Sequence, residues 1–246
     1  MNAMISMNFP QVQAFCAEHC VQMVQAGPDQ ICPECAKNAV NKNNREHQKH
    51  VDQMVRELHF GGAMIPARHK DSGFRNYKTV HDGQSNALSS CVDFAKTIIA
   101  RQKRNLIMTG KTGTGKTHLS CATARTLLSK GIYVRYITSE DMANEIANAW
   151  KKPDDSESSA VYRFSEYDLL IVDEYGLHDR HENRLQLVHK VLYSRYDAGK
   201  ATMIVSNMTA HELQKDLGDR LWSRFQHDGL VMVECNWADQ RVGGGV

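Results

Sequence analysis

The stretch that most constrains this chain is the octapeptide at residues 110–117, Gly-Lys-Thr-Gly-Thr-Gly-Lys-Thr. It fills every fixed position of the pattern G-x-x-x-x-G-K-[ST], in which glycines let consecutive backbone N–H groups turn toward phosphate oxygens. Lys116 is expected to reach the β- and γ-phosphates, and the Thr117 hydroxyl to bind Mg²⁺. The predicted nucleotide-binding residues are Gly110, Lys111, Thr112, Gly113, Thr114, Gly115, Lys116, Thr117 and His118.

The residues on either side of the octapeptide support this interpretation. Residues 105–109 form a short apolar run that is expected to be a buried strand, and residues 118–128 are expected to form a helix. The structural alternative is a glycine-rich turn that binds nothing. Strand, loop and helix in this order favour a nucleoside triphosphate site instead.

A second motif lies at residues 168–174, Asp-Leu-Leu-Ile-Val-Asp-Glu, where an apolar stretch ends in two adjacent carboxylates. In a phosphate-loop enzyme the first of these, Asp173, would hold Mg²⁺ through water together with Thr117, and Glu174 would polarise the attacking water. An apolar strand followed by an acidic pair is common, so this motif alone is weak. Downstream of the octapeptide, it predicts Mg²⁺-dependent ATP hydrolysis.

Three more polar side chains are candidates for such a site. Asn207 follows an expected strand, where it would sense the γ-phosphate or hold the water, although asparagine is also ordinary in turns. Arg220 and Arg224 would share one face of a helix. An arginine supplied to the γ-phosphate of a neighbouring subunit stabilises charge in the transition state. The alternative is a pair of surface ion pairs with Asp219 and Asp228.

Strand and helix patterns alternate through the larger part of the chain, which favours an α/β domain with a doubly wound, largely parallel sheet. Thr138 and Thr209 open capping-box sequences, and Gly131 and Gly199 are expected to end helices. Further strands are expected at residues 132–137, 201–205 and 230–234, further helices at 86–100, 138–150, 180–198 and 213–217, and a surface loop at 151–159.

The seven cysteines, in a chain without an export signal, favour thiols or metal ligands over disulfides. Four of them form two close pairs, Cys16 with Cys20 and Cys32 with Cys35. Two such pairs can bring four thiolates around a tetrahedral Zn²⁺, and a module this small would depend on the metal for stability. His19 could replace one thiolate, and reduced cysteines without metal are the structural alternative. The segment is predicted to be a zinc-stabilised module without a catalytic role.

Residues 36–60 are polar and basic, with apolar residues at helical spacing between 51 and 58. A solvated linking helix is the plain interpretation, and an arm that binds a partner protein or nucleic acid is the functional alternative. Gly61 and Gly62 are expected to break this helix. They place a domain boundary near residue 61, between units 1–60 and 61–246.

Composition sets few limits on function. A net charge of +2 is too small to predict nucleic-acid binding from overall electrostatics, so such binding would need a local patch. No run of about 18 apolar residues is present, and the N-terminus lacks the pattern of a signal peptide. A cytoplasmic protein without a membrane partner is expected.

Taken together, residues 73–242 resemble the DnaC-type helicase loaders, a branch of the AAA+ ATPases related to the initiator DnaA and the transposition ATPase IstB. The resemblance implies an AAA+/ASCE P-loop fold. Because only residues 235–246 follow the last expected strand, no C-terminal lid domain is expected. Besides the two motifs above, the matching segments are 73–77 (Gly-Phe-Arg-Asn-Tyr), 84–88 (Gln-Ser-Asn-Ala-Leu), Ser206 with Asn207, 217–225, and Asn236, Trp237 and Arg241.

The resemblance also implies site roles and partners. Arg224 corresponds to the arginine finger with Arg220 beside it, and Arg241 falls where a second nucleotide sensor is placed. The family's N-terminal end grips a hexameric, DnaB-like replicative helicase, and its ATP-bound subunits assemble in a spiral or ring. ATP hydrolysis to ADP then leaves the helicase on single-stranded DNA. The cysteine-bearing N-terminus lies outside the resemblance and would hold the helicase by different means. DNA contacts would fall within residues 139–162.

Two other functions would use the same core. One is a DNA transposition ATPase that recruits a transposase; co-purification of the zinc module with a helicase and not a transposase would separate the two. The other is an adaptor with a vestigial nucleotide site. It would show no Mg²⁺-dependent ATP hydrolysis even with single-stranded DNA and helicase present.

Overall fold

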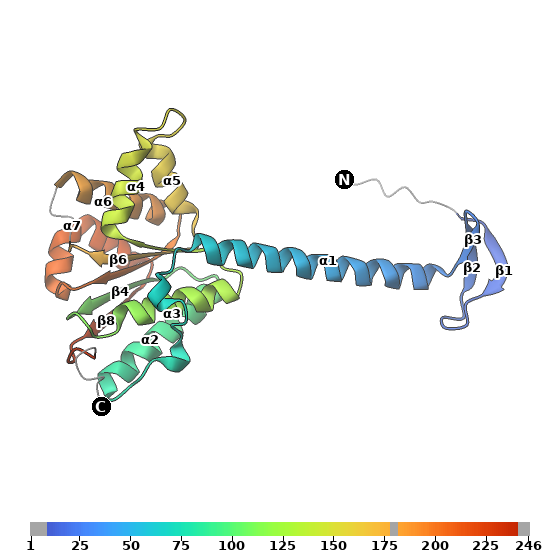
Figure 1. Cartoon of the computed structure of the whole chain (residues 1–246), viewed down its shortest axis with the longest axis horizontal. Helices are drawn as coiled ribbons and strands as arrows, with labels where there is room; N and C mark the ends of the chain where they lie inside the picture. Colours follow the sequence, from blue (N-terminus) through green and yellow to red (C-terminus); the bar gives the residue numbers. More distant parts are fainter. Residues whose placement is uncertain (1–8, 178–181, 241–246) are drawn as a thin grey trace. The chain divides into compact units, whose positions relative to one another are not determined.

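The computed structural model describes residues 9–177 and 182–240 of the chain (Figure 1). The chain divides into two compact units, residues 1–55 and 56–246. The division falls within helix α1 (Pro33–Gly62). Within the described ranges, no helix has the length and apolar composition needed to cross a membrane.

The N-terminal unit contains a three-stranded antiparallel sheet, which the sequence analysis did not predict. It consists of β1 (Gln11–Phe15), β2 (Gln22–Ala26) and β3 (Asp29–Ile31), in that order. Gly27 makes the tight turn between β2 and β3 with a φ of 65°, a left-handed conformation that glycine adopts without steric cost. Every side chain of these strands is exposed or half-buried. So small a sheet needs a further source of stability.

Helix α1 is longer than the predicted 36–60. Pro33 occupies its first position, where the missing N–H costs no hydrogen bond. Gly61 and Gly62 form its last turn, so they do not end it where the sequence predicted. None of its 30 residues is buried.

The second unit is built on a five-stranded parallel sheet in the order β5-β6-β7-β4-β8, which confirms the predicted fold class (Figure 1). β7 lies between β4 and β6, so the strand before the octapeptide and the strand with the acidic pair are not neighbours. Their carboxyl ends still lie on one edge of the sheet, where ligands bind in open parallel sheets. The strands are β4 (Asn105–Gly110), β5 (Val134–Thr138), β6 (Leu169–Tyr175), β7 (Ala201–Ser206) and β8 (Leu230–Cys235).

Helices cover both faces of this sheet (Figure 1). Successive strand side chains point to opposite faces, so Leu106 and Met108 lie in one core cluster and Ile107 in the other. The first cluster includes residues of α2 and α3, and the second residues of α4 to α7. The helices are α2 (Asp82–Ile99), α3 (Lys116–Ser129), α4 (Ser139–Ala149), α5 (Glu157–Glu166), α6 (Glu182–Asp197) and α7 (Ala210–His227), with the 3-10 turns η1 (Ala67–His69) and η2 (Phe74–Asn76).

The structure confirms four of the predicted helix ends. Thr138 and Thr209 are the N-caps of α4 and α7, and each accepts a hydrogen bond from a backbone N–H of the first turn, at 3.1 and 3.2 Å. Gly131 and Gly199 follow α3 and α6 with φ values of 75° and 64°. Two predictions need correction. α2 begins at Asp82 and not at residue 86, and α5 begins inside the stretch 151–159 that was predicted as a loop. The predicted helix end at residue 217 is confirmed, because Gly218 is non-helical and forms a kink, after which a second helical stretch of α7 continues to His227.

A buried cation fastens the end of α6 to the sheet. Arg195 is fully buried, and its guanidinium donates hydrogen bonds to the backbone oxygens of Phe164, Tyr167 and Ala201 and to the Thr202 hydroxyl. Burial lowers the pKa of this guanidinium to about 9, which leaves it charged at neutral pH. The partners lie at the end of α5, before β6 and at the start of β7, so one side chain ties three elements together.

Candidate functional site

The octapeptide turns from the end of β4 into α3. Gly113 and Gly115 have φ values of 76° and 90°, which side-chain-bearing residues rarely adopt. At Gly110 packing also excludes a side chain, because a Cβ atom there would lie 2.2 Å from the backbone oxygen of Cys235. The loop therefore needs its glycines for both its turn and its close approach to β8.

The loop forms one wall of a cavity of about 380 Å³. The cavity brings the octapeptide, the acidic pair and Asn207 together. His69, Leu177 and Gln240 also line it, and the sequence analysis did not single them out. The lining residues are His69, Thr112, Gly113, Thr114, Gly115, Lys116, Thr117, His118, Asp173, Glu174, Leu177, Ser206, Asn207 and Gln240.

The Lys116 ammonium is held on the loop itself. Its Nζ donates hydrogen bonds of 2.7 and 2.8 Å to the backbone oxygens of Gly110 and Lys111. Only 6% of the residue is exposed. A cation so placed gives the wall of the cavity a positive charge next to the backbone N–H groups of the loop.

The carboxylate of Asp173 is fixed by three hydrogen bonds. Its Oδ2 accepts one from the Thr117 hydroxyl at 3.1 Å and one from the Tyr136 hydroxyl at 2.5 Å. Its Oδ1 accepts one from the backbone N–H of Glu174 at 2.7 Å. Asp173 is buried, whereas Glu174 is exposed and has a φ of 55°. The acidic pair thus offers one fixed carboxylate and one that faces the cavity.

The segment after β8 packs on the octapeptide. The indole N–H of Trp237 donates to the backbone oxygen of Thr114 at 2.8 Å. The backbone N–H of Gln240 donates to the backbone oxygen of Gly113 at 3.0 Å. The Asp239 carboxylate lies against Gly113, since a Cβ atom there would be 1.8 Å from its Oδ1. Residues 237–240 therefore contact the turn that is expected to hold phosphates. Arg241 lies outside the described residues.

His118 lies beside a second cavity of about 440 Å³ next to the first. Its Nε2 is 3.0 Å from the backbone oxygen of Gly73, and its ring lies 5.4 Å from that of Tyr77. The second cavity is lined by Asn76, Tyr77, Lys78, Gln84, Thr114, Gly115, His118, Asp239 and Gln240.

Arg220 and Arg224 lie on α7 after its kink and do not line the cavity of their own chain. Arg224 lies over the rings of Tyr193 and Tyr196, with its guanidinium carbon 4.8 and 4.7 Å from their centroids. It also forms an ion pair of 3.3 Å with Asp197, not with the acids considered from sequence. Arg220 is exposed.

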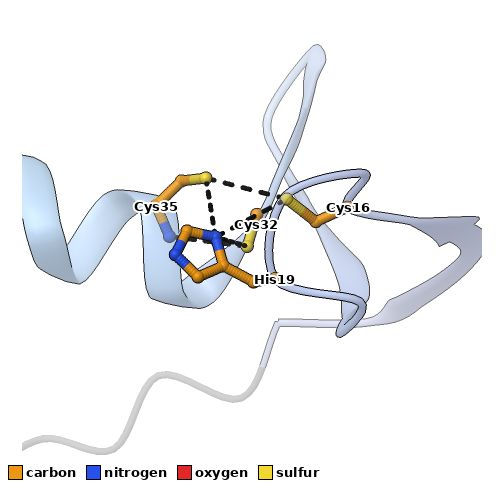
Figure 2. A group of neighbouring side chains, drawn as sticks. All are labelled: Cys16, His19, Cys32 and Cys35. Atoms are coloured by element: carbon orange, nitrogen blue, oxygen red, sulfur yellow. Dashed lines mark hydrogen bonds between the residues drawn. The ribbon is translucent and has the colours of Figure 1, made fainter.

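The N-terminal unit holds a cluster of potential metal ligands (Figure 2). The sulfurs of Cys16, Cys32 and Cys35 and Nδ1 of His19 all lie within 4.8 Å of one another. Nδ1 is 3.3 Å from the Cys35 sulfur, 3.7 Å from that of Cys16 and 3.8 Å from that of Cys32. Ligand atoms around a tetrahedral Zn²⁺ are about 3.5 to 3.8 Å apart. The donor set and its spacing therefore fit Zn²⁺.

The cluster corrects one of the four predicted ligands. Cys20 lies outside it and is exposed, and His19 takes its place. Cys20 has a φ of 53°, a left-handed turn that directs the chain back toward β2. Hydrogen bonds from the backbone and side chain of His19 lower the pKa of the Cys16 thiol to about 6. A lowered pKa favours the thiolate, the form that binds metals.

The fold and the site together define a class of protein. The second unit has a phosphate-binding loop between β4 and α3 and an acidic pair at the end of β6, and β7 lies between β4 and β6 in the sheet. This arrangement belongs to a P-loop nucleoside triphosphatase domain of the AAA+ type. Residues 43–232 match the family described as IstB-like ATP binding protein, and the chain belongs to this family.

Known proteins similar to this chain agree with that class. The chain is 25% identical over 231 residues to the replicative helicase loader DnaC of Escherichia coli K12, a match that covers 94% of this chain and 93% of that protein. A crystal structure of the DnaC helicase loader has a TM-score of 0.61 at 19% identity, covering 69% of this chain and 99% of that one. AMPPCP-bound DnaA from Aquifex aeolicus has a TM-score of 0.57 at 22% identity, covering 70% and 51%.

Proposed function

We propose that this protein is an ATP-dependent loader that binds a replicative DNA helicase and delivers it to single-stranded DNA when replication begins. The observation that carries this proposal is the match to a helicase loader along nearly the whole of both chains. A match of that extent reaches beyond residues 73–242 and into the cysteine-bearing N-terminus, which the resemblance seen in the sequence did not cover. It therefore supports a shared task as well as a shared fold.

ATP or ADP would occupy the two adjoining cavities. The phosphates would lie against residues 110–117, where Lys116 would exchange its backbone partners for phosphate oxygens. The base would lie in the second cavity, beside Tyr77. Thr114, Gly115, His118 and Gln240 line both cavities, so one nucleotide can reach from one to the other.

Thr117 and Asp173 would hold Mg²⁺, which prefers oxygen ligands. The Thr117 hydroxyl donates its hydrogen to Asp173, so the lone pairs of the Thr117 oxygen remain available to the cation. When bound, Mg²⁺ would neutralise charge on the phosphates. Glu174 would polarise the attacking water, and Asn207 would contact the γ-phosphate, since both line the same cavity.

Arg224 would complete the site of a neighbouring subunit in a spiral or ring. It lies outside the cavity of its own chain, as an arginine that acts on another subunit must. The rings of Tyr193 and Tyr196 hold its guanidinium in place. Arg220, on the same exposed part of α7, would assist it.

The N-terminal unit would hold the helicase, with Zn²⁺ bound by Cys16, His19, Cys32 and Cys35. Its sheet has no buried strand residue, and the cluster joins the chain before β2 to the start of α1. A metal there would supply stability that the sheet lacks. The role is structural, because all four positions around the ion would be taken by the protein.

A loading assay tests the proposal. The full chain is mixed with a hexameric helicase and circular single-stranded DNA covered by single-strand-binding protein, and helicase on the DNA is measured after gel filtration. Helicase should reach the DNA only with this protein and Mg-ATP, and Lys116→Ala should abolish loading while Lys130→Ala, an exposed lysine, retains it. Equal loading without the protein would contradict the proposal.

An ATPase that assists DNA transposition is the second candidate, favoured by the match to IstB-like proteins. The two functions differ in their partner. Capture of a purified transposase instead of a replicative helicase by the full chain, in the presence of ATP, would support the second candidate and exclude the first.

A further inference from the structure

Tyr136 reaches the acidic pair from a neighbouring strand. It lies on β5, two residues before Thr138, which pairs with Asp173 across the β5–β6 ladder. Its hydroxyl donates to Oδ2 of Asp173 at 2.5 Å, and the two residues are 6% and 3% exposed. The same oxygen accepts the Thr117 hydroxyl at 3.1 Å. One carboxylate oxygen thus joins β5, β6 and α3.

We propose that Tyr136 is a positioning residue of the cation site, whose hydroxyl fixes the Asp173 carboxylate in the orientation that binds Mg²⁺. The inference rests on the proposed role of Asp173 in ATP binding. It adds a residue to that site that neither motif contains.

The geometry explains why a hydroxyl is needed at this position. With its Oδ1 bonded to the backbone N–H of Glu174 and its Oδ2 bonded to Tyr136, the carboxylate plane cannot rotate. Thr117 alone would not fix it, because that hydroxyl would also face the cation. Hydrogen-bond partners of metal-binding groups typically set metal affinity in this way.

Packing alone does not require the hydroxyl. The Tyr136 ring lies in the apolar cluster with Val134, Leu169 and Ile171. The backbone N–H of Tyr136 donates to the backbone oxygen of Ala63 at 2.9 Å. A phenylalanine would fill the same space. An ionised carboxylate can only accept hydrogen bonds, so the Tyr136 hydroxyl is the donor in its contact with Asp173.

The test compares Tyr136→Phe with the full wild-type chain. Binding of a fluorescent ATP analogue is measured in EDTA and then as a function of Mg²⁺. The half-saturating Mg²⁺ concentration should rise about tenfold in the variant, while affinity in EDTA stays unchanged. Tyr133→Phe is the matched control, because its hydroxyl bonds to Tyr167 and not to the acidic pair. It should match wild type in both readouts.

An identical Mg²⁺ dependence in wild type and Tyr136→Phe would overturn the inference, and so would a parallel loss of affinity with and without Mg²⁺. If wild type itself binds no Mg-nucleotide, the proposed function fails instead. A second measurement, made on wild type, tests the inference even when Tyr136→Phe does not fold. In protein labelled with ¹³C at the tyrosine Cζ atoms, Mg²⁺ added to the nucleotide complex should shift the Tyr136 signal, and absence of any tyrosine shift would also overturn the inference.

Discussion

The indole N–H of Trp237 donates a 2.8 Å hydrogen bond to the backbone oxygen of Thr114, in the middle of the phosphate-binding loop. Trp237 is 8% exposed and Thr114 1%, so water does not compete for this bond. The bond ties the segment after β8 to the loop that follows β4. The shape of the loop therefore depends on residues far along the chain.

Trp237→Phe keeps an aromatic ring but removes this donor. The Thr114 oxygen would retain only a 3.4 Å bond from the Tyr77 hydroxyl. We expect a loss of ~1–3 kcal/mol in the free energy of unfolding, because a buried acceptor loses its better partner, and weaker ATP binding. Urea denaturation and nucleotide titration measure the two effects. Trp150→Phe, at an exposed tryptophan, is the control and should change neither.

Asp239→Asn should tighten ATP binding severalfold. The Asp239 carboxylate lies against Gly113, where it would repel the phosphates that the loop binds. The gain should shrink as salt concentration rises, because the carboxylate is exposed and screened. Titration of ATP at low and high salt measures it. Asp29→Asn, in the N-terminal unit, gives the baseline, and equal affinity of all three proteins at low salt would count against the prediction.

Arg195→Met should destabilise the second unit by ~3–5 kcal/mol. The methionine fills much of the volume but leaves the buried oxygens of Phe164, Tyr167 and Ala201 without this donor. Thermal and urea denaturation of the full chain measure the loss. Arg104→Met, at an exposed arginine, should cost little. A stability equal to wild type would mean that water replaces the guanidinium.

Arg224→Ala should reduce ATP hydrolysis at least about 100-fold and leave ATP affinity unchanged. The same rate loss could follow from a disturbed α7, so the decisive measurement is a mixture. Arg224→Ala subunits combined with Lys116→Ala subunits should regain activity, because some interfaces then join an intact loop to an intact arginine. A mixture as inactive as its components would contradict action between subunits.

Zn²⁺ content should distinguish His19 from Cys20. Wild type and Cys20→Ser should each retain Zn²⁺ after gel filtration, and Cys35→Ser should lose it. His19→Cys should also retain the ion, because a thiolate can replace the imidazole in a tetrahedral site. Elemental analysis measures the metal, and hydrogen exchange in β1 to β3 should rise when a chelator removes it. Loss of Zn²⁺ from Cys20→Ser would contradict the ligand set.

The sequence was sufficient where a function depends on consecutive residues. The octapeptide and the acidic pair are local patterns with apolar strands before them, and the structure places both on one cavity. The caps at Thr138 and Thr209 were predictable for the same reason, since a cap and its partner lie within one turn.

Relationships across the sheet were not predictable. Tyr136 meets Asp173 only because β5 and β6 pair in a register that no local pattern reveals. The sequence offered His19 as an alternative ligand, but only the structure of the turn, in which Cys20 is left-handed, shows that His19 and not Cys20 joins the cluster. The three short strands of the N-terminal unit lack a buried face, so they give only a weak alternating signal.

Helix α6, anchored by Arg195, contacts both the acidic strand and Arg224. Arg195 fixes the C-terminal end of α6 through its hydrogen bonds to backbone oxygens. On the same helix, Nε2 of His189 lies 2.9 Å from the hydroxyl of Tyr175, the residue after Glu174. Arg224 rests on Tyr193 and Tyr196 of that helix. These contacts therefore run from the residue after Glu174, through α6, to the guanidinium of Arg224. Helix α6 is thus the element that links the acidic strand of one ATP site to the arginine proposed for the next.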